Sequence, residues 1–140
     1  MNAQEIRNIM ATNEVRALLL SMSGSKEFQE ATRGRVKDIR MGAQELCLRY
    51  ILFCFKYDWE QKECKDLQAM ATMMDMVLTL LNKRKTEDLA ALLLMFKDSM
   101  KKCYALLGEY AFSKESSRHI INKPLFICWS VVLTVCSSKQ

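Results

Sequence analysis

Apolar residues recur every three or four positions through most of this chain, which is the spacing of one face of an α-helix. The pattern is clear over residues 15–22, 66–83 and 89–107. Between residues 42 and 57 the apolar positions leave little polar face, so this helix is expected at the centre of the bundle. No stretch alternates between apolar and polar residues as a half-buried strand would. The sequence therefore predicts an all-α fold, a helical bundle of six or seven helices.

Capping residues and helix breakers divide this pattern into elements. Asn2 followed by Glu5 is the spacing of a capping box, which predicts a first helix ending near residue 11. Side chains that accept hydrogen bonds from free backbone N–H groups are expected at the start of three further helices. They are Thr12 or Asn13, Thr86, and Asn122. The expected helix ends are Ser23-Gly24-Ser25, the residues before Gly34, and Gly108.

Length and composition agree with one helical domain. The chain has 140 residues, 50% of them hydrophobic, which is enough to bury a core. One proline and four glycines are too few to punctuate an all-β chain. The side chains expected to pack together in the core come from every long segment. They are Leu46, Ile51, Phe53, Leu78, Leu93, Phe96 and Phe126.

Six cysteines without any Cys-x-x-Cys spacing, mostly within apolar stretches, indicate reduced core thiols rather than a disulfide framework. The N-terminus has no basic and then apolar leader. The apolar run 124–136 is shorter than the roughly 20 residues that span a bilayer. A cytoplasmic protein without a membrane partner is therefore expected.

Catalytic and metal chemistry is not expected. The single histidine, His119, falls short of the three or four ligands of a zinc site. The isolated glycines form no phosphate-binding loop, so no cofactor is expected. Arg49 lies in the most apolar helix and would be costly to bury alone, so pairing with Glu45 is expected. Met73 and Met76 would form an adaptable binding surface if both pointed outward.

The net charge of +5 is modest, and most of the excess lies towards the two ends of the chain. One cluster of basic residues is suited to binding a polyanion. Its four cations, within eight residues, could contact consecutive phosphates of a DNA backbone. They are Arg33, Arg35, Lys37 and Arg40. The alternative is a solvated connection between helices, and the lack of interleaved aromatic residues gives no sign of base stacking.

Four segments in order resemble the helical part of GmrSD-type restriction nucleases, a bacterial group with a ParB-like nucleotide-handling domain that acts against foreign DNA. They are NAQEIRN at 2–8, RM with ELCLRY within 40–50, GEYAF at 108–112 and INKPLF at 121–126. The likeness covers roughly residues 2 to 130. The ParB-like catalytic motif, which precedes the NAQEIRN segment in the family, is not in this chain, and neither is the His-Asn-His nuclease half. The resemblance therefore implies a non-catalytic module, expected to be a fragment of a longer protein.

Two hypotheses of function follow. In the first, the chain is a helical module of a restriction or phage-defence protein that supports a ParB-like domain and contacts DNA backbone through its basic end. The resemblance places four polar residues at the junction with that domain, although they could equally be a capped, exposed helix: Gln4, Glu5, Arg7 and Asn8. In the alternative, the chain is a stand-alone interaction or oligomerisation module. Exposure of Ile6, Ile9 and Met10 would favour self-association.

Overall fold

The fold is an all-α bundle, as the sequence predicts. The computed structural model describes residues 1–58, 63–64, 68–113 and 120–138. Seven α-helices are described. They are α1 (Ala3–Met10), α2 (Asn13–Ser23), α3 (Lys26–Thr32), α4 (Gly42–Lys56), α5 (Met70–Asn82), α6 (Thr86–Leu107) and α7 (Lys123–Ser138). Two short 3-10 helices, η1 (Ile39–Met41) and η2 (Gly108–Tyr110), precede α4 and follow α6.

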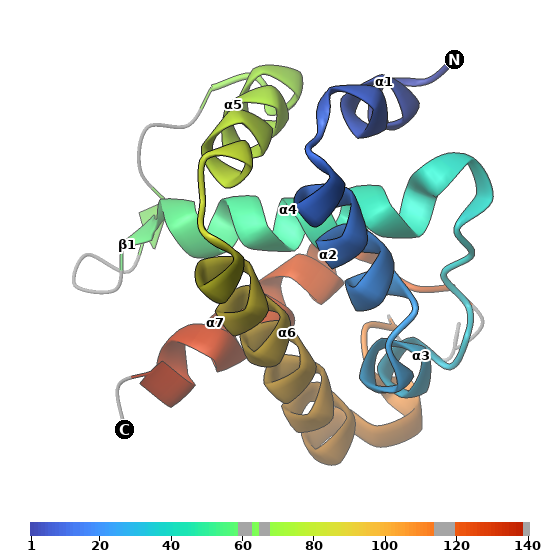
Figure 1. Cartoon of the computed structure of the whole chain (residues 1–140). Helices are drawn as coiled ribbons and strands as arrows, with labels where there is room; N and C mark the ends of the chain where they lie inside the picture. Colours follow the sequence, from blue (N-terminus) through green and yellow to red (C-terminus); the bar gives the residue numbers. More distant parts are fainter. Residues whose placement is uncertain (59–62, 65–67, 114–119, 139–140) are drawn as a thin grey trace.

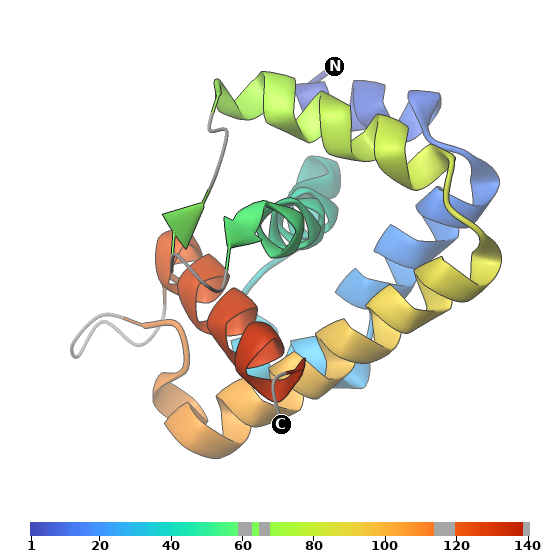
Figure 2. The ribbon, with the colours of Figure 1, turned by 90° about the vertical axis from the view of Figure 1, so that its left-hand side faces the viewer.

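Helix α4 lies at the centre of the bundle, where its nearly all-apolar surface predicted it. Figure 2 shows α4 almost end-on, surrounded by the other long helices. It packs against α2, α5 and α7, and its first turns contact α1. Buried side chains therefore occur on every side of it. They are Ala43, Gln44, Leu46, Cys47, Leu48, Tyr50, Ile51 and Leu52.

The longest helix, α6, closes one side of the bundle by packing against α2, α3 and α7 (Figure 1). Aromatic rings join these elements around Phe96. The centroid of its ring lies 5.1 Å from that of Tyr50 and 5.8 Å from that of Phe28. Phe126 extends the cluster, 5.9 Å from Phe28 and 4.8 Å from Phe112. Each tilted or edge-on pair contributes about 0.5–1.5 kcal/mol beyond its area burial. All seven expected core side chains lie within this core or pack against it.

Most caps agree with the sequence. The side chains of Asn2, Thr12 and Asn122 accept hydrogen bonds from the backbone N–H groups of Glu5, Val15 and Leu125. Gly24 and Gly108 are the C-terminal caps of α2 and α6.

Two helix starts differ from the prediction. Thr86 is the first residue of α6 rather than its cap, and Lys85 takes the cap position without a side-chain bond. Helix α5 begins at Met70 rather than at Asp66, because Ala69 is extended and serves as its cap. Two two-residue strands, β1 (Tyr57–Asp58) and β2 (Glu63–Cys64), follow α4 and pair antiparallel. His119, which the sequence excluded as a metal site, lies outside the described residues.

The cysteines of the described helices are free thiols, as predicted, but not all of them are in the core. Cys47 and Cys103 are buried, whereas Cys128 is exposed. Burial raises the pKa of the Cys54 and Cys103 thiols to about 12. Among the described helices none is both long and apolar enough to cross a membrane.

Candidate interaction site on the first helix

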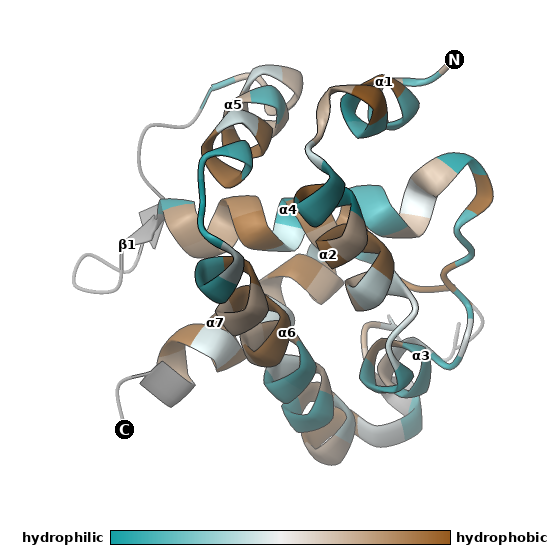
Figure 3. Cartoon of the chain, viewed as in Figure 1, coloured by the Kyte–Doolittle hydropathy of each residue, from teal (hydrophilic) through white to brown (hydrophobic). Residues whose placement is uncertain are grey.

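Helix α1 is docked on the molecule with its polar face inward. Its only buried residues are Gln4 and Arg7, with 1% and 5% of their surface exposed. The large apolar side chains point the other way. Ile6, Ile9 and Met10 are 48%, 64% and 68% exposed. Figure 3 shows hydrophobic colours on α1 at the edge of the molecule, away from the core. This orientation is the reverse of an ordinary surface helix, whose apolar stripe faces the core.

An ion pair with α5 explains why Arg7 is turned inward. Its Nε lies 2.9 Å from Oδ1 of Asp75, and the Arg7 side chain is 6% exposed whereas that of Asp75 is 69% exposed. The guanidinium is therefore covered by α1 and its neighbours, while the carboxylate keeps most of its water. An arginine buried without such a partner would be strongly unfavourable. This pair fixes the rotation of α1 about its own axis.

A second set of polar contacts joins the start of α1 to η1. The side chain of Asn2 donates from Nδ2 to the backbone oxygen of Arg40 at 2.9 Å. Arg40 in turn places its Nε 3.2 Å from Oε1 of Glu5. Glu5 thus pairs with Arg40, and the capping bond of this turn comes from Asn2. Arg40 and Met41 both have positive φ angles, 51° and 64°, so the chain turns sharply where it meets α1.

The end of α1 is held by a side chain of α5. Asn82 donates from Nδ2 to the backbone oxygen of Met10 at 3.2 Å and accepts from the backbone N–H of Thr12 at 3.0 Å. From α2, Arg16 donates from Nη1 to the backbone oxygen of Asn8 at 3.0 Å. Three parts of the fold therefore hold α1 through polar groups. None of these contacts uses its apolar face.

One buried polar atom of α1 has no hydrogen-bond partner among the described residues. It is Oε1 of Gln4. A buried acceptor without a donor costs about 1–3 kcal/mol. Gln4 therefore does not stabilise the inward face as Arg7 does.

The four residues predicted to contact a neighbouring domain are thus divided between two faces. Gln4 and Arg7 are turned into the chain, whereas Glu5 and Asn8 are half-buried at the border of the helix. The side chains open to a partner are the apolar ones. The sequence contained the signal for this arrangement, because Ile6, Ile9 and Met10 share one side of a helix. The spacing alone does not say which side faces inward, since that depends on Asp75 and Arg40 from distant parts of the chain.

Searches against models of protein families, curated proteins and solved structures found no match to this chain.

The predicted basic segment is divided between a contact within the fold and the surface. Arg33 donates from Nη1 to the backbone oxygen of Ala111 at 3.0 Å and from Nη2 to Oγ of Ser113 at 2.8 Å. Burial, with a smaller contribution from the neighbouring charge of Arg35, lowers the pKa of Arg33. Arg35, Lys37 and Arg40 are exposed. The structure thus places three of these cations on the surface and uses Arg33 to hold the segment after η2.

Two further predictions have clear outcomes. Arg49 pairs with Glu45, as expected, with 2.9 Å between Nη2 and Oε1. The condition for a binding surface shared by Met73 and Met76 is not met, because Met73 is 3% exposed and only Met76 is open, at 44%. They lie three positions apart, and Met73 belongs to the face of α5 that covers α4. Within the described ranges, no three His, Cys, Asp or Glu side chains are grouped so that they could hold a metal ion.

Proposed function

We propose that this chain is a non-catalytic helical module that docks a partner domain through the outward face of α1. The observation that carries the proposal is the reversed orientation of this helix, with Ile6, Ile9 and Met10 exposed and Arg7 held inside. Exposed apolar side chains that lie together on one face often mark an interaction site, whereas scattered single ones are ordinary. Polar contacts from η1, α2 and α5 hold α1 in place, so the patch is preformed.

The partner proposed for this face is a ParB-like domain. The NAQEIRN segment that resembles GmrSD-type nucleases, residues 2–8, comprises the N-terminal cap and most of α1. In that family this segment follows the ParB-like domain along the chain. Docking there would make the bundle a support for a restriction or phage-defence enzyme. Polar groups at the border of the patch, Glu5 and Asn8 among them, suit the rim of such an interface, because interface cores are apolar and their rims are polar.

Titration with the ParB-like domain of a GmrSD-type relative tests this proposal. Calorimetry is expected to show binding by the wild type and none by Ile9→Glu, because the substitution would bury an unpaired carboxylate in the interface. The matched control is Leu94→Glu on α6, which changes a side chain that is 68% exposed far from α1 in sequence. Equal binding by all three proteins, or binding by none of them, would contradict the proposal.

The chain alone is expected to have no turnover. Purified protein incubated with nucleoside triphosphates and with modified or unmodified plasmid should leave both unchanged. Sustained hydrolysis that a point mutation in this chain abolishes would overturn this part of the proposal.

A weaker, additional role in contacting DNA backbone is supported by the exposure of Arg35, Lys37 and Arg40 within one short segment. Arg40 also pairs with Glu5 of α1, so substituting it would disturb the docking of that helix, and Arg35 and Lys37 are the positions at which the segment is tested. The expected binding is weak and independent of sequence. A dissociation constant of roughly 10⁻⁴ to 10⁻⁶ M at physiological salt is the usual scale for such contacts.

A further inference from the structure

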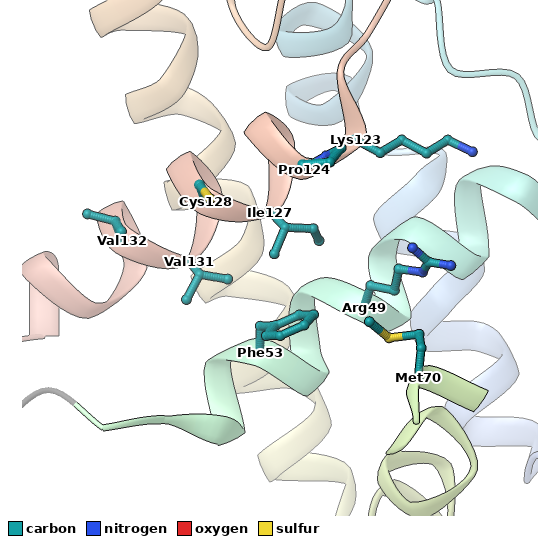
Figure 4. A pocket seen from close by; sticks show the side chains of 9 residues that line it. All are labelled: Arg49, Phe53, Met70, Lys123, Pro124, Ile127, Cys128, Val131 and Val132. Atoms are coloured by element: carbon teal, nitrogen blue, oxygen red, sulfur yellow. The ribbon is translucent and has the colours of Figure 1, made fainter. Parts of the chain in front are cut away.

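An apolar pocket of about 400 Å³ opens between α4, α7 and the first residue of α5. Its walls include Phe53 from α4, Met70 from α5, and Ile127 and Val131 from α7 (Figure 4). This volume lies within the range of roughly 300–1,000 Å³ that is usual for small-molecule sites. Figures 1 and 2 show α7 and α1 on opposite sides of α4, so the pocket is separate from the candidate docking face.

Positive charge gathers at one end of this pocket. Arg49 and Lys123 are its only charged lining residues among those described, and Figure 4 shows both side chains towards the same end. Helix α7 begins at Lys123, so the positive end of its dipole lies there as well. Nη2 of Arg49 donates to Oε1 of Glu45 at 2.9 Å, and 34% of the Arg49 side chain is exposed. Lys123 is exposed as well, so both cations can approach a ligand at this end of the pocket. Charge-assisted hydrogen bonds from such groups are suited to a bound carboxylate.

The α7 wall of the pocket is long enough for an extended alkyl chain. Its α7 wall runs from Lys123 to Val132, nine helical steps or about 13 Å. Apolar side chains line this wall beyond the cationic end. We propose that the pocket binds a medium-chain alkyl carboxylate, with the carboxylate at Arg49 and Lys123 and the alkyl chain along α7.

Calorimetric titration with hexanoate, octanoate and decanoate tests the proposal. Each added methylene group is expected to lower the dissociation constant about fourfold while the chain lengthens within the pocket. Decanol, which has the same chain without the charge, should bind at least tenfold more weakly than decanoate. Decanol binding as tightly as decanoate would overturn the proposal, because the cations would then have no role.

Substitutions separate recognition of the head group from structural damage. Arg49→Gln and Lys123→Gln are each expected to weaken decanoate at least fivefold and to leave decanol unchanged. Lys101→Gln, at an exposed cation on α6, is the matched control and should bind decanoate as the wild type does. Equal weakening of decanoate and decanol by Arg49→Gln would contradict a direct contact with the carboxylate.

Cys128 provides an independent readout of the site. Its thiol lines the pocket and is exposed, whereas Cys47 and Cys103 are buried. Saturating decanoate should slow the reaction of Cys128 with a thiol reagent by at least fivefold, both in the wild type and in Ile9→Glu. Loss of protection in Ile9→Glu would place the ligand on α1 and overturn the proposal. Failure of every carboxylate to bind would also overturn the proposal. The alternative occupant of the pocket would then be an apolar side chain of a protein partner.

Discussion

At the scale of single residues, α1 is defined by two buried polar side chains with opposite consequences. Arg7 is paired with Asp75, and removing Asp75 would leave the buried guanidinium without a compensating charge, whereas Asp75 itself is mostly solvated. Gln4 is equally buried, but its Oε1 has no donor among the described residues. The protein therefore retains a polar group that does not contribute a hydrogen bond to the described fold.

Gln4→Leu is expected to raise the free energy of unfolding by about 1 kcal/mol, because it replaces an unsatisfied buried acceptor with an apolar group of similar size. Urea denaturation monitored by circular dichroism measures this. The matched control is Gln44→Leu, since Gln44 is also buried but donates from Nε2 to Oδ2 of Asp38 at 2.7 Å. Gln44→Leu should lower the free energy of unfolding. A loss of stability in Gln4→Leu as large as in Gln44→Leu would show that the Gln4 side chain is satisfied.

Buried thiols predict how stability depends on pH. Burial raises the pKa of Cys54 and Cys103 from 9.0 to about 12. Below pH 9 these thiols are protonated in both states, but between about pH 9 and 12 the unfolded chain loses protons that the folded chain retains. Their contribution to stability is therefore complete below pH 9 and declines as the pH rises. Urea unfolding from pH 7 to 11 should show a shallower decline for Cys103→Ala than for the wild type. Cys128→Ala, at an exposed position, is the control, and an equal slope in all three proteins would contradict the burial of Cys103.

At the scale of elements, the sequence predicted much more of the fold than of the candidate site. Apolar spacing located the long helices and the central place of α4, because a helix without a polar face must be covered on all sides. The orientation of α1 could not be predicted in this way. Its apolar and polar faces were both evident, but contacts with Asp75, Arg40 and Asn82 decide which face is inside. These contacts span sequence separations of 35 to 72 residues. The pocket was missed for a similar reason, since Phe53, Met70 and Ile127 meet only in the folded chain.

Asn2→Ala is expected to loosen α1 as a unit. The substitution removes the cap of the helix and the bond to the backbone of Arg40, at a cost of about 1 kcal/mol. Hydrogen exchange should become faster throughout α1 and remain unchanged in α6. Asn8→Ala is the control, because Asn8 is engaged by Arg16 through its backbone oxygen. Unchanged exchange in α1 of Asn2→Ala would contradict the assigned role of this residue.

At the scale of the whole molecule, the cations Arg35 and Lys37 and the apolar face of α1 lie on different elements and make separable predictions. Arg35 and Lys37 belong to the connection between α3 and η1, whereas the apolar face belongs to α1. Substitutions in the basic segment should therefore leave association through α1 unchanged, and substitutions on α1 should leave DNA binding unchanged. Sites without shared partners are expected to behave independently.

Salt dependence tests the basic segment. If Arg35 and Lys37 each contact a phosphate, replacing both with Ala should reduce the slope of log K against log salt by about 2, since each contact to duplex DNA contributes about 0.9. Arg33 is left intact because it holds the segment at Ala111 and Ser113. Fluorescence anisotropy with a labelled duplex provides the measurement, and a double substitution of Lys97 and Lys101 on α6 is the control. An unchanged slope would show that Arg35 and Lys37 do not contact the DNA backbone.

The most direct test of the central claim is sedimentation velocity of the isolated chain over a hundredfold range of concentration. Without a partner domain, the apolar face of α1 is expected to pair with a second copy of the chain, burying about 1,000 Å² in total. The wild type and Leu94→Glu should then shift from monomer towards dimer as the concentration rises, while Ile9→Glu should stay monomeric. A wild-type chain that is monomeric throughout, or an Ile9→Glu variant that associates as the wild type does, would contradict the assignment of α1 as the interaction surface.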